Sequence, residues 1–347
     1  MADIKLDAVE KHFGGAAALH GITATIRDGE FVALLGPSGC GKSTLLRLLA
    51  GFEAPTYGAL SIGPKEMANA ATGHAVPPEA RNIGFVFQSY ALWPHMSVRR
   101  NVSFALEIRG LPKSEQTRQT DAALAATGLV PFGDRMPSEL SGGQRQRVAL
   151  ARCLVSDPDA VLLDEPLANL DVALRASMQE VFLDFHQRSA ATMVYVTHDQ
   201  AEAMAMADRI AVMSEGRIIQ FDTPETLYSR PCNRFVAGFV GEGAVLPITD
   251  FTGQTEGGTA ALAGSRIRVK TTDPRANHLC LRPEDITLSE SGDLRACVTR
   301  STYLGGRYRL SLRSTDGAEL IAESRERYRE GRQLGLTIGT PWAFYED

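Results

Sequence analysis

Hydrophobic and polar residues alternate at the start of the chain and then give way to continuous apolar runs. Ile4, Leu6 and Ala8 alternate with polar neighbours, which is typical of a strand with one buried face. Three later runs are almost entirely apolar, which indicates strands buried on both faces. These runs are 31–35, 160–163 and 192–196, and 82–87 forms another β-rich stretch.

Segments with a helical pattern lie between these strands. They cover 44–50, 97–155 and 172–188. Strands that alternate with helices are expected to pair in parallel through right-handed crossovers. Residues 214–216, Ser-Glu-Gly between two further β-rich runs, predict a hairpin. The pattern therefore predicts an α/β core with a helical subdomain at about 89–155.

The character of the chain changes near residue 235. Beyond it, short β-like stretches with frequent Gly, Thr and Asp replace the helical patterns, for example at 266–270 and 307–312. Such a series predicts a small all-β domain, closed as a barrel. We therefore expect two domains, 1–235 and 236–347.

A glycine-rich loop joins the first apolar run to the helix that follows it. Residues 36–43 fit the pattern G-x-x-x-x-G-K-[ST] in full. Glycines let backbone N–H groups turn inward around phosphates, and the N-terminus of the next helix favours an anion. Lys42 is expected to reach the β- and γ-phosphates of a nucleotide, and the Ser43 hydroxyl suits Mg²⁺. The expected phosphate-binding residues are Gly36, Pro37, Ser38, Gly39, Cys40, Gly41, Lys42, Ser43 and Thr44.

Two adjacent acids end the strand at 160–163. Asp164 is expected to hold Mg²⁺, directly or through water. The chain leaving the strand can bring Glu165 to the γ-phosphate, where its carboxylate would polarise the attacking water. A solvated strand end is the alternative for an isolated Asp-Glu pair, but the phosphate loop in the same chain favours the catalytic interpretation.

A serine followed by two glycines opens another helical stretch. Ser141 is a suitable N-cap, and the N–H groups beyond it form a second anion site. A helix start with flexible glycines is the alternative. The pentapeptide Leu-Ser-Gly-Gly-Gln at 140–144 lies ahead of the Asp-Glu strand, and this arrangement resembles the signature of ABC-type ATPases.

The resemblance covers residues 1 to about 235 almost without gaps and extends more loosely to the end. Phe13 matches the aromatic residue that stacks on adenine, Gln88 the Q-loop glutamine, and His198 the switch histidine. Residues 168–171, Ala-Asn-Leu-Asp, resemble the D-loop, with Asp171 as its acid; many relatives have Ser where Ala168 stands. The implied fold is a P-loop NTPase core with antiparallel β and helical subdomains, followed by an all-β domain similar to an oligonucleotide/oligosaccharide-binding fold.

The resemblance also implies a head-to-tail homodimer that hydrolyses ATP. Each ATP would be held by one chain's phosphate loop and by the other chain's signature. The implied catalytic residues are Lys42, Gln88, Glu165 and His198; the Mg²⁺ ligands are Ser43, Gln88 and Asp164; the signature and D-loop ligands are Ser141, Gly142, Gly143, Gln144 and Asp171.

The C-terminal part narrows the resemblance to the ATPases of bacterial importers. Arg282-Pro283-Glu284 resembles an element of their accessory domain, and residues 239–247 are closer to ferric-iron and polyamine types than to sugar types. The expected partners are membrane permease subunits, contacted through the apolar segment 90–94, and indirectly a periplasmic or surface solute-binding protein. The remaining alternative is an ABC ATPase with a non-transport role.

Composition limits where the protein acts. A net charge of −5, from 36 basic and 41 acidic residues, argues against a general nucleic-acid binder. The five cysteines are scattered, which fits a reducing compartment. No signal peptide and no run of about 18 apolar residues is evident. Together with these features, the resemblance to bacterial import ATPases implies a peripheral protein at the cytoplasmic face of the bacterial inner membrane.

Overall fold

The computed structural model describes residues 3–168, 170–254 and 257–346, and the chain forms two compact units. The first unit spans Met1–Pro224 and the second Glu225–Asp347. Among the described residues, no helix combines the length and the apolar character needed to cross a bilayer.

The first unit is built on a six-stranded sheet. Four of its five pairings are parallel, and the pair β10–β11 at one edge is antiparallel. All residues of the two central strands are buried, as their apolar sequences predict. The strand order is β11 (Arg217–Asp222), β10 (Arg209–Ser214), β3 (Phe31–Leu35), β9 (Thr192–Thr197), β8 (Ala160–Asp164) and β7 (Ile83–Val86).

A second, antiparallel sheet packs with helix α1 (Lys42–Ala50). Ile4, Leu6, Leu45 and Leu49 belong to one buried cluster that joins this sheet to the helix. Its strands are β2 (Ala16–Ile26), β1 (Ile4–Phe13), β4 (Tyr57–Ile62), β5 (Lys65–Asn69) and β6 (His74–Ala75). The helix that follows the phosphate loop is therefore fixed between the two sheets.

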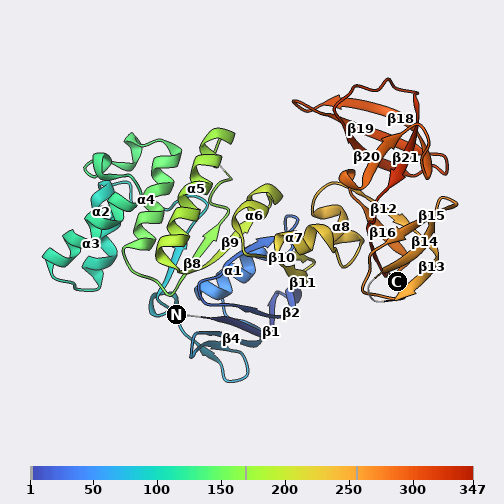
Figure 1. Ribbon diagram of the computed structural model, residues 1–347. Coiled ribbons are helices and arrows are strands. Elements are labelled where there is room, and N and C mark those ends of the chain that lie inside the picture. The colour runs from blue at the N-terminus through green and yellow to red at the C-terminus, as the bar shows by residue number, and fades with distance from the viewer. Residues whose placement is uncertain (1–2, 169, 255–256, 347) are drawn as a thin grey trace. The chain divides into compact units, whose positions relative to one another are not determined.

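Three helices form the predicted helical subdomain, and two more cover the core. Helices α2 (Val98–Ile108), α3 (Lys113–Ala126) and α4 (Gly142–Leu154) pack around one another (Figure 1). Helices α5 (Val172–Ser189) and α6 (Gln200–Met206) lie side by side on the core. The predicted α/β core with antiparallel and helical subdomains is confirmed.

The second unit begins with two short helices and is otherwise all β, as predicted. The helices are α7 (Pro224–Ser229) and α8 (Arg234–Phe239). One three-stranded sheet contains β12 (Ala244–Pro247), β16 (His278–Leu281) and β22 (Trp342–Phe344), and another β13 (Thr249–Gln254), β14 (Gly257–Leu262) and β15 (Ser265–Val269). The largest sheet has the order β17 (Ile286–Ser289), β21 (Gln333–Ile338), β18 (Leu294–Tyr303), β19 (Tyr308–Ser314) and β20 (Glu319–Ser324).

The expected boundary at 235–236 lies inside this second unit. Arg282, which is only 4% exposed, explains why the two units divide between Pro224 and Glu225. Its guanidinium donates to the carbonyl oxygens of Tyr228, Ala237 and Glu242. These bonds hold both short helices against the end of β16, so that the residues from 225 onward pack with the β domain.

A buried arginine stabilises the end of helix α1. Arg81 is 1% exposed, and burial lowers its pKa. Its guanidinium donates to the backbone carbonyls of Leu48, Leu49, Met67 and Val76. The positive charge lies at the C-terminus of the helix, where the helix dipole favours a cation.

We expect Arg81→Met to lower the free energy of unfolding by about 3 kcal/mol or more, because buried carbonyls lose their donor. Urea denaturation measures the change. The matched control is Arg100→Met, whose side chain is 60% exposed, and we expect it to change stability by less than about 0.5 kcal/mol. A loss below about 1 kcal/mol for Arg81→Met would contradict the role given to this cation.

Candidate active site

The loop between β3 and α1 wraps around the amine of Lys42. The side chain is 5% exposed, and its amine donates to the carbonyls of Gly36 at 2.7 Å and Pro37 at 2.9 Å. The thiol of Cys40 lies 3.7 Å from the same nitrogen. A cation is thus held within the curve of a glycine-rich loop, as the sequence pattern predicts.

Two glycines in this loop leave no room for a side chain. A Cβ on Gly36 would lie 2.3 Å from the carbonyl oxygen of Met213. Gly41 has a φ of +102°, and a Cβ there would lie 2.7 Å from a methyl group of Leu19. The loop therefore curves tightly enough for its backbone to approach a phosphate closely.

The Ser43 hydroxyl donates to Asp164 at the end of β8, with an Oγ–Oδ1 distance of 3.1 Å. Burial is the largest influence on this carboxyl and raises the pKa of Asp164, whereas the bond from Ser43 opposes that rise. A hydroxyl and a carboxylate at this distance form a set of hard oxygen donors. Such donors fit Mg²⁺, which prefers oxygen ligands.

Glu165 and His198 meet beside the loop. Glu165 has a φ of +43° and its N–H donates to the carbonyl of Val196, so the chain turns sharply as it leaves β8. Its Oε2 lies 3.5 Å from Nδ1 of His198, which follows β9. A carboxylate and an imidazole are therefore adjacent at the carboxyl ends of the neighbouring strands β8 and β9.

A cavity of about 230 Å³ lies over the phosphate loop. The residues that line it are Ala18, Ser38, Gly39, Gly41, Lys42, Ser43, Thr44 and Glu165. Six of the nine expected phosphate ligands thus share one cavity with Glu165, whereas Gly36, Pro37 and Cys40 are not among its described lining residues.

Phe13 and Gln88 are not among the described residues that line this cavity. Phe13 ends β1, is 47% exposed, and has the ammonium of Lys11 at 4.9 Å from its ring centre. Gln88 is exposed and lies just beyond β7. The roles predicted for Phe13 on adenine and for Gln88 on Mg²⁺ and water stay predictions.

The Ser141 segment opens helix α4, as predicted. The hydroxyl of Ser141 accepts from the N–H of Gln144, and the Gln144 side chain accepts from the N–H of Ser141. A Cβ on Gly143 would lie 2.7 Å from a methyl group of Leu174 on α5. Within the described part of the chain, residues 141–144 contribute nothing to the lining of the phosphate cavity.

Asp171 also begins a helix, because its side chain accepts from the N–H of Leu174 at the start of α5. Asn169 of the predicted D-loop lies outside the described residues. Glu202 was not predicted as part of the site; it is 4% exposed and accepts from the hydroxyls of Tyr195 and Thr197. Its position on the apolar face of a short helix could have indicated a buried, hydrogen-bonded carboxylate.

We expect Asp164→Asn to abolish Mg²⁺-dependent ATP hydrolysis and yet to raise Tm at pH 7. Burial raises the pKa of Asp164 in the folded protein, so ionisation at neutral pH costs folding free energy. The stability linked to this carboxyl is fully present below its unfolded pKa and is lost as pH rises through its folded pKa. The Tm difference should therefore shrink toward acidic pH. A lower Tm for Asp164→Asn at pH 7 would refute this.

Comparisons with known proteins agree with this geometry. The ABC transporter family matches residues 19–168, and the TOBE domain matches residues 279–342. The spermidine/putrescine import ATP-binding protein of Rubrobacter xylanophilus is 43% identical and aligns with 98% of this chain and 91% of its own. The sn-glycerol-3-phosphate import ATP-binding protein of Ruegeria pomeroyi is 45% identical, and the alignment covers 88% of this chain and 85% of the relative.

Two further comparisons extend the match. The Fe(3+) ions import ATP-binding protein of Brucella suis is 41% identical, with 92% of this chain and 90% of the relative covered. A dimeric ATP-binding cassette bound to ADP and Pi superposes with a TM-score of 0.55 at 30% identity, covering 63% of this chain and 98% of the cassette. With these relatives and this glycine-wrapped site, the chain belongs to the ABC transporter family, as an ATP-binding subunit of the import type with a C-terminal TOBE domain.

Proposed function

We propose that two copies of this ATP-hydrolysing subunit bind ATP between them. The phosphate loop of each chain would hold the triphosphate, and the Ser141 segment of the other chain would close over it. The observation that carries the proposal is that two anion-binding elements are separate within one chain. None of the residues 141–144 is among the described residues that line the cavity over Lys42. Val172, next to Asp171, is 82% exposed, which suits a protein interface.

Each chain contributes its own ligands for the triphosphate. The Lys42 amine would exchange the carbonyls of Gly36 and Pro37 for phosphate oxygens, which are stronger acceptors. Ser43 and Asp164, together with Gln88, would hold Mg²⁺. When bound, the ion neutralises charge on the phosphate oxygens. The loop N–H groups would bind the oxygens that Lys42 does not reach.

Glu165 and His198 would position the attacking water. The Glu165 carboxylate would accept a proton from the water. The water oxygen bonds to the γ-phosphorus at the same time, and the bond between that phosphorus and the ADP oxygen breaks. His198, at 3.5 Å from that carboxylate, would orient the water and the γ-phosphate. The products are ADP and inorganic phosphate, and their formation would weaken the contact between the two chains.

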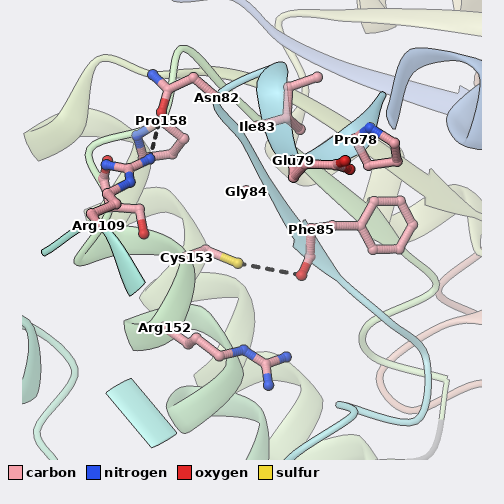
Figure 2. Close-up of a pocket in the computed structure, with 11 residues that line it drawn as sticks. Pro78, Glu79, Asn82, Ile83, Gly84, Phe85, Arg109, Arg152, Cys153 and Pro158 are labelled. Carbon is pink, nitrogen blue, oxygen red and sulfur yellow. Dashed lines mark hydrogen bonds between the residues drawn. The ribbon is translucent and has the colours of Figure 1, made fainter. Parts of the chain in front are cut away.

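We place the permease contact on exposed aromatic rings near β7. Tyr90, expected in that role from the apolar segment 90–94, is 8% exposed and belongs to the core. Phe52 and Phe87 are 46% and 37% exposed and both pack against Phe85. Figure 2 shows Phe85 beside a cavity of about 210 Å³ between β7 and α4, which would receive a permease segment. The protein would then act peripherally at the cytoplasmic face of the bacterial inner membrane.

For the cargo, we propose ferric iron or a polyamine in preference to a sugar. The preference comes from residues 239–247, which lack the segment typical of sugar importers. Relatives named for spermidine/putrescine and for Fe(3+) ions support both choices. The relative named for glycerol-3-phosphate is equally similar, so that solute belongs in the same test.

The test is ATP hydrolysis after reconstitution with the permease and solute-binding protein of each candidate import system. Loaded binding protein should stimulate hydrolysis when the cargo is a polyamine or ferric iron. Stimulation only by glycerol-3-phosphate or a sugar would overturn the cargo proposal. Hydrolysis indifferent to permease and binding protein would favour the alternative, an ABC ATPase with a non-transport role.

A further inference from the structure

A partly buried ionic network of Arg175, Asp199 and Glu202 lies around the loop that carries His198. We propose that Arg175 on α5 is a positioning residue for ATP hydrolysis, which fixes the backbone on both sides of His198 and joins it to the end of the 166–171 segment. The proposal rests on the role given to His198 under the proposed function.

The first attachment is Asp199, the residue after His198. Asp199 caps α6, because its Oδ1 accepts from the N–H groups of Ala201 and Glu202. Its other oxygen, Oδ2, accepts from Nη1 of Arg175 at 2.9 Å. Arg175 therefore holds a carboxylate that already fixes the start of α6.

The second attachment is Glu202, one turn along α6. Its Oε1 lies 3.5 Å from Nε of Arg175, and its Oε2 accepts from Tyr195 at 2.6 Å and from Thr197 at 2.7 Å. Thr197 precedes His198, and its hydroxyl also accepts from the N–H of Asp199 at 3.0 Å. Both neighbours of His198 are thus bound into the network that Arg175 completes.

The third attachment leads back toward Glu165. Nη2 of Arg175 lies 3.4 Å from the carbonyl of Leu170, at the end of the segment that begins at Glu165. Helices α5 and α6 lie side by side, so one side chain spans both (Figure 1). Arg175 therefore connects the two loops that carry the water-positioning pair, Glu165 and His198.

The geometry requires a planar group with several donors. Two nitrogens of one guanidinium donate, Nη1 to Asp199 and Nη2 to Leu170, while the third, Nε, lies 3.5 Å from the Glu202 carboxylate as an ion pair without a hydrogen bond. A lysine amine is a single point charge and would not span these acceptors. The His198 side chain itself is 59% exposed and lacks such packing, so its placement depends on the backbone that the network holds.

The network also reaches the surface proposed to meet the second chain. Leu170 and Asp171 lie next to the exposed Val172. Movement of that segment on dimer closure would reach His198 through Arg175. The distance between His198 and Glu165 would thereby depend on the presence of the partner chain.

Kinetics of four variants test the proposal: Arg175→Gln, His198→Ala, the double variant, and Arg188→Gln. The last removes an exposed arginine from the far end of the same helix. Single-turnover release of radiolabelled phosphate quantifies even slow variants, and steady-state assays give kcat and KM. Thermal unfolding confirms that each variant is folded.

We expect Arg175→Gln to lower kcat at least about tenfold with KM for ATP within about threefold, because the phosphate loop is untouched. In the His198→Ala background, Arg175→Gln should lower kcat by less than about twofold, because Arg175 acts through His198. Arg188→Gln should match the wild type. Losses that multiply in the double variant, or an Arg175→Gln effect confined to KM, would overturn the role of Arg175. Wild-type turnover by His198→Ala would instead refute the role of His198 in the proposed function.

Discussion

Glu165→Gln is expected to stop ATP hydrolysis while ATP still binds, and to hold two chains together around the trapped nucleotide. The amide has the size of the carboxylate but cannot take a proton from water, so the rate should fall by about 10²–10⁴-fold. The turn at Glu165 is set by its backbone, whose N–H donates to Val196, and the substitution leaves that bond in place. The lining of the cavity would otherwise be unchanged.

Phosphate release measures the loss in Glu165→Gln, and a fluorescent ATP analogue measures binding. The control is Glu180→Gln, an exposed acid on α5 that should hydrolyse ATP normally. Hydrolysis by Glu165→Gln at the wild-type rate would show that another group activates the water.

Lys42→Met is expected to weaken ATP binding by about 100-fold or more, which corresponds to about 2.7 kcal/mol. The substitution removes the only ammonium that the phosphate cavity has among its described lining residues. The variant also removes the donor to the carbonyls of Gly36 and Pro37, so a loss of stability within the loop is expected and folding is checked separately. Hydrolysis falls with binding in this variant.

Equilibrium binding of the same ATP analogue measures the effect, with thermal unfolding as a check on folding. Lys65→Met, at the exposed start of β5, removes an equal charge away from the loop and should bind ATP normally. If Lys42→Met bound ATP as tightly as the wild type, the nucleotide would not occupy this loop.

Much of the core could be predicted from the sequence because its signals are local. A buried parallel strand has a continuous apolar sequence, which can be recognised without knowing its neighbours. The residues of the phosphate loop are likewise contiguous in the chain. Ser43 and Asp164 are 121 residues apart in the chain. Asp164 ends β8 and Ser43 lies just beyond the loop that follows β3, and the carboxyl ends of parallel strands meet at one edge of a sheet. The hairpin turn at Glu215 and Gly216 is likewise set by adjacent residues with positive φ.

Features that depend on distant partners could not be predicted. Helices α7 and α8 are six residues each, too short for a helical period to emerge. Their packing depends on Arg282, which lies far along the chain. Tyr90 was expected at the surface as part of the apolar segment 90–94, but it is 8% exposed and packs in the core.

The candidate site shows the same division. The structure brings Lys42, Ser43, Asp164, Glu165 and His198 together because Asp164 ends β8, Glu165 and His198 directly follow β8 and β9, and Lys42 and Ser43 open α1. The Arg175 network escaped prediction because its geometry depends on how α5 crosses α6, and no local pattern encodes that crossing.

The most direct test of a shared nucleotide site mixes two inactive chains, Lys42→Ala and Ser141→Arg. Neither variant alone can form an intact site, because one lacks the phosphate-binding amine and the other blocks the N-terminus of α4. In a mixed dimer, however, one site combines an unaltered Lys42 with an unaltered Ser141. We predict that mixing restores ATP hydrolysis, whereas a mixture as inactive as its components would contradict a site built from two chains.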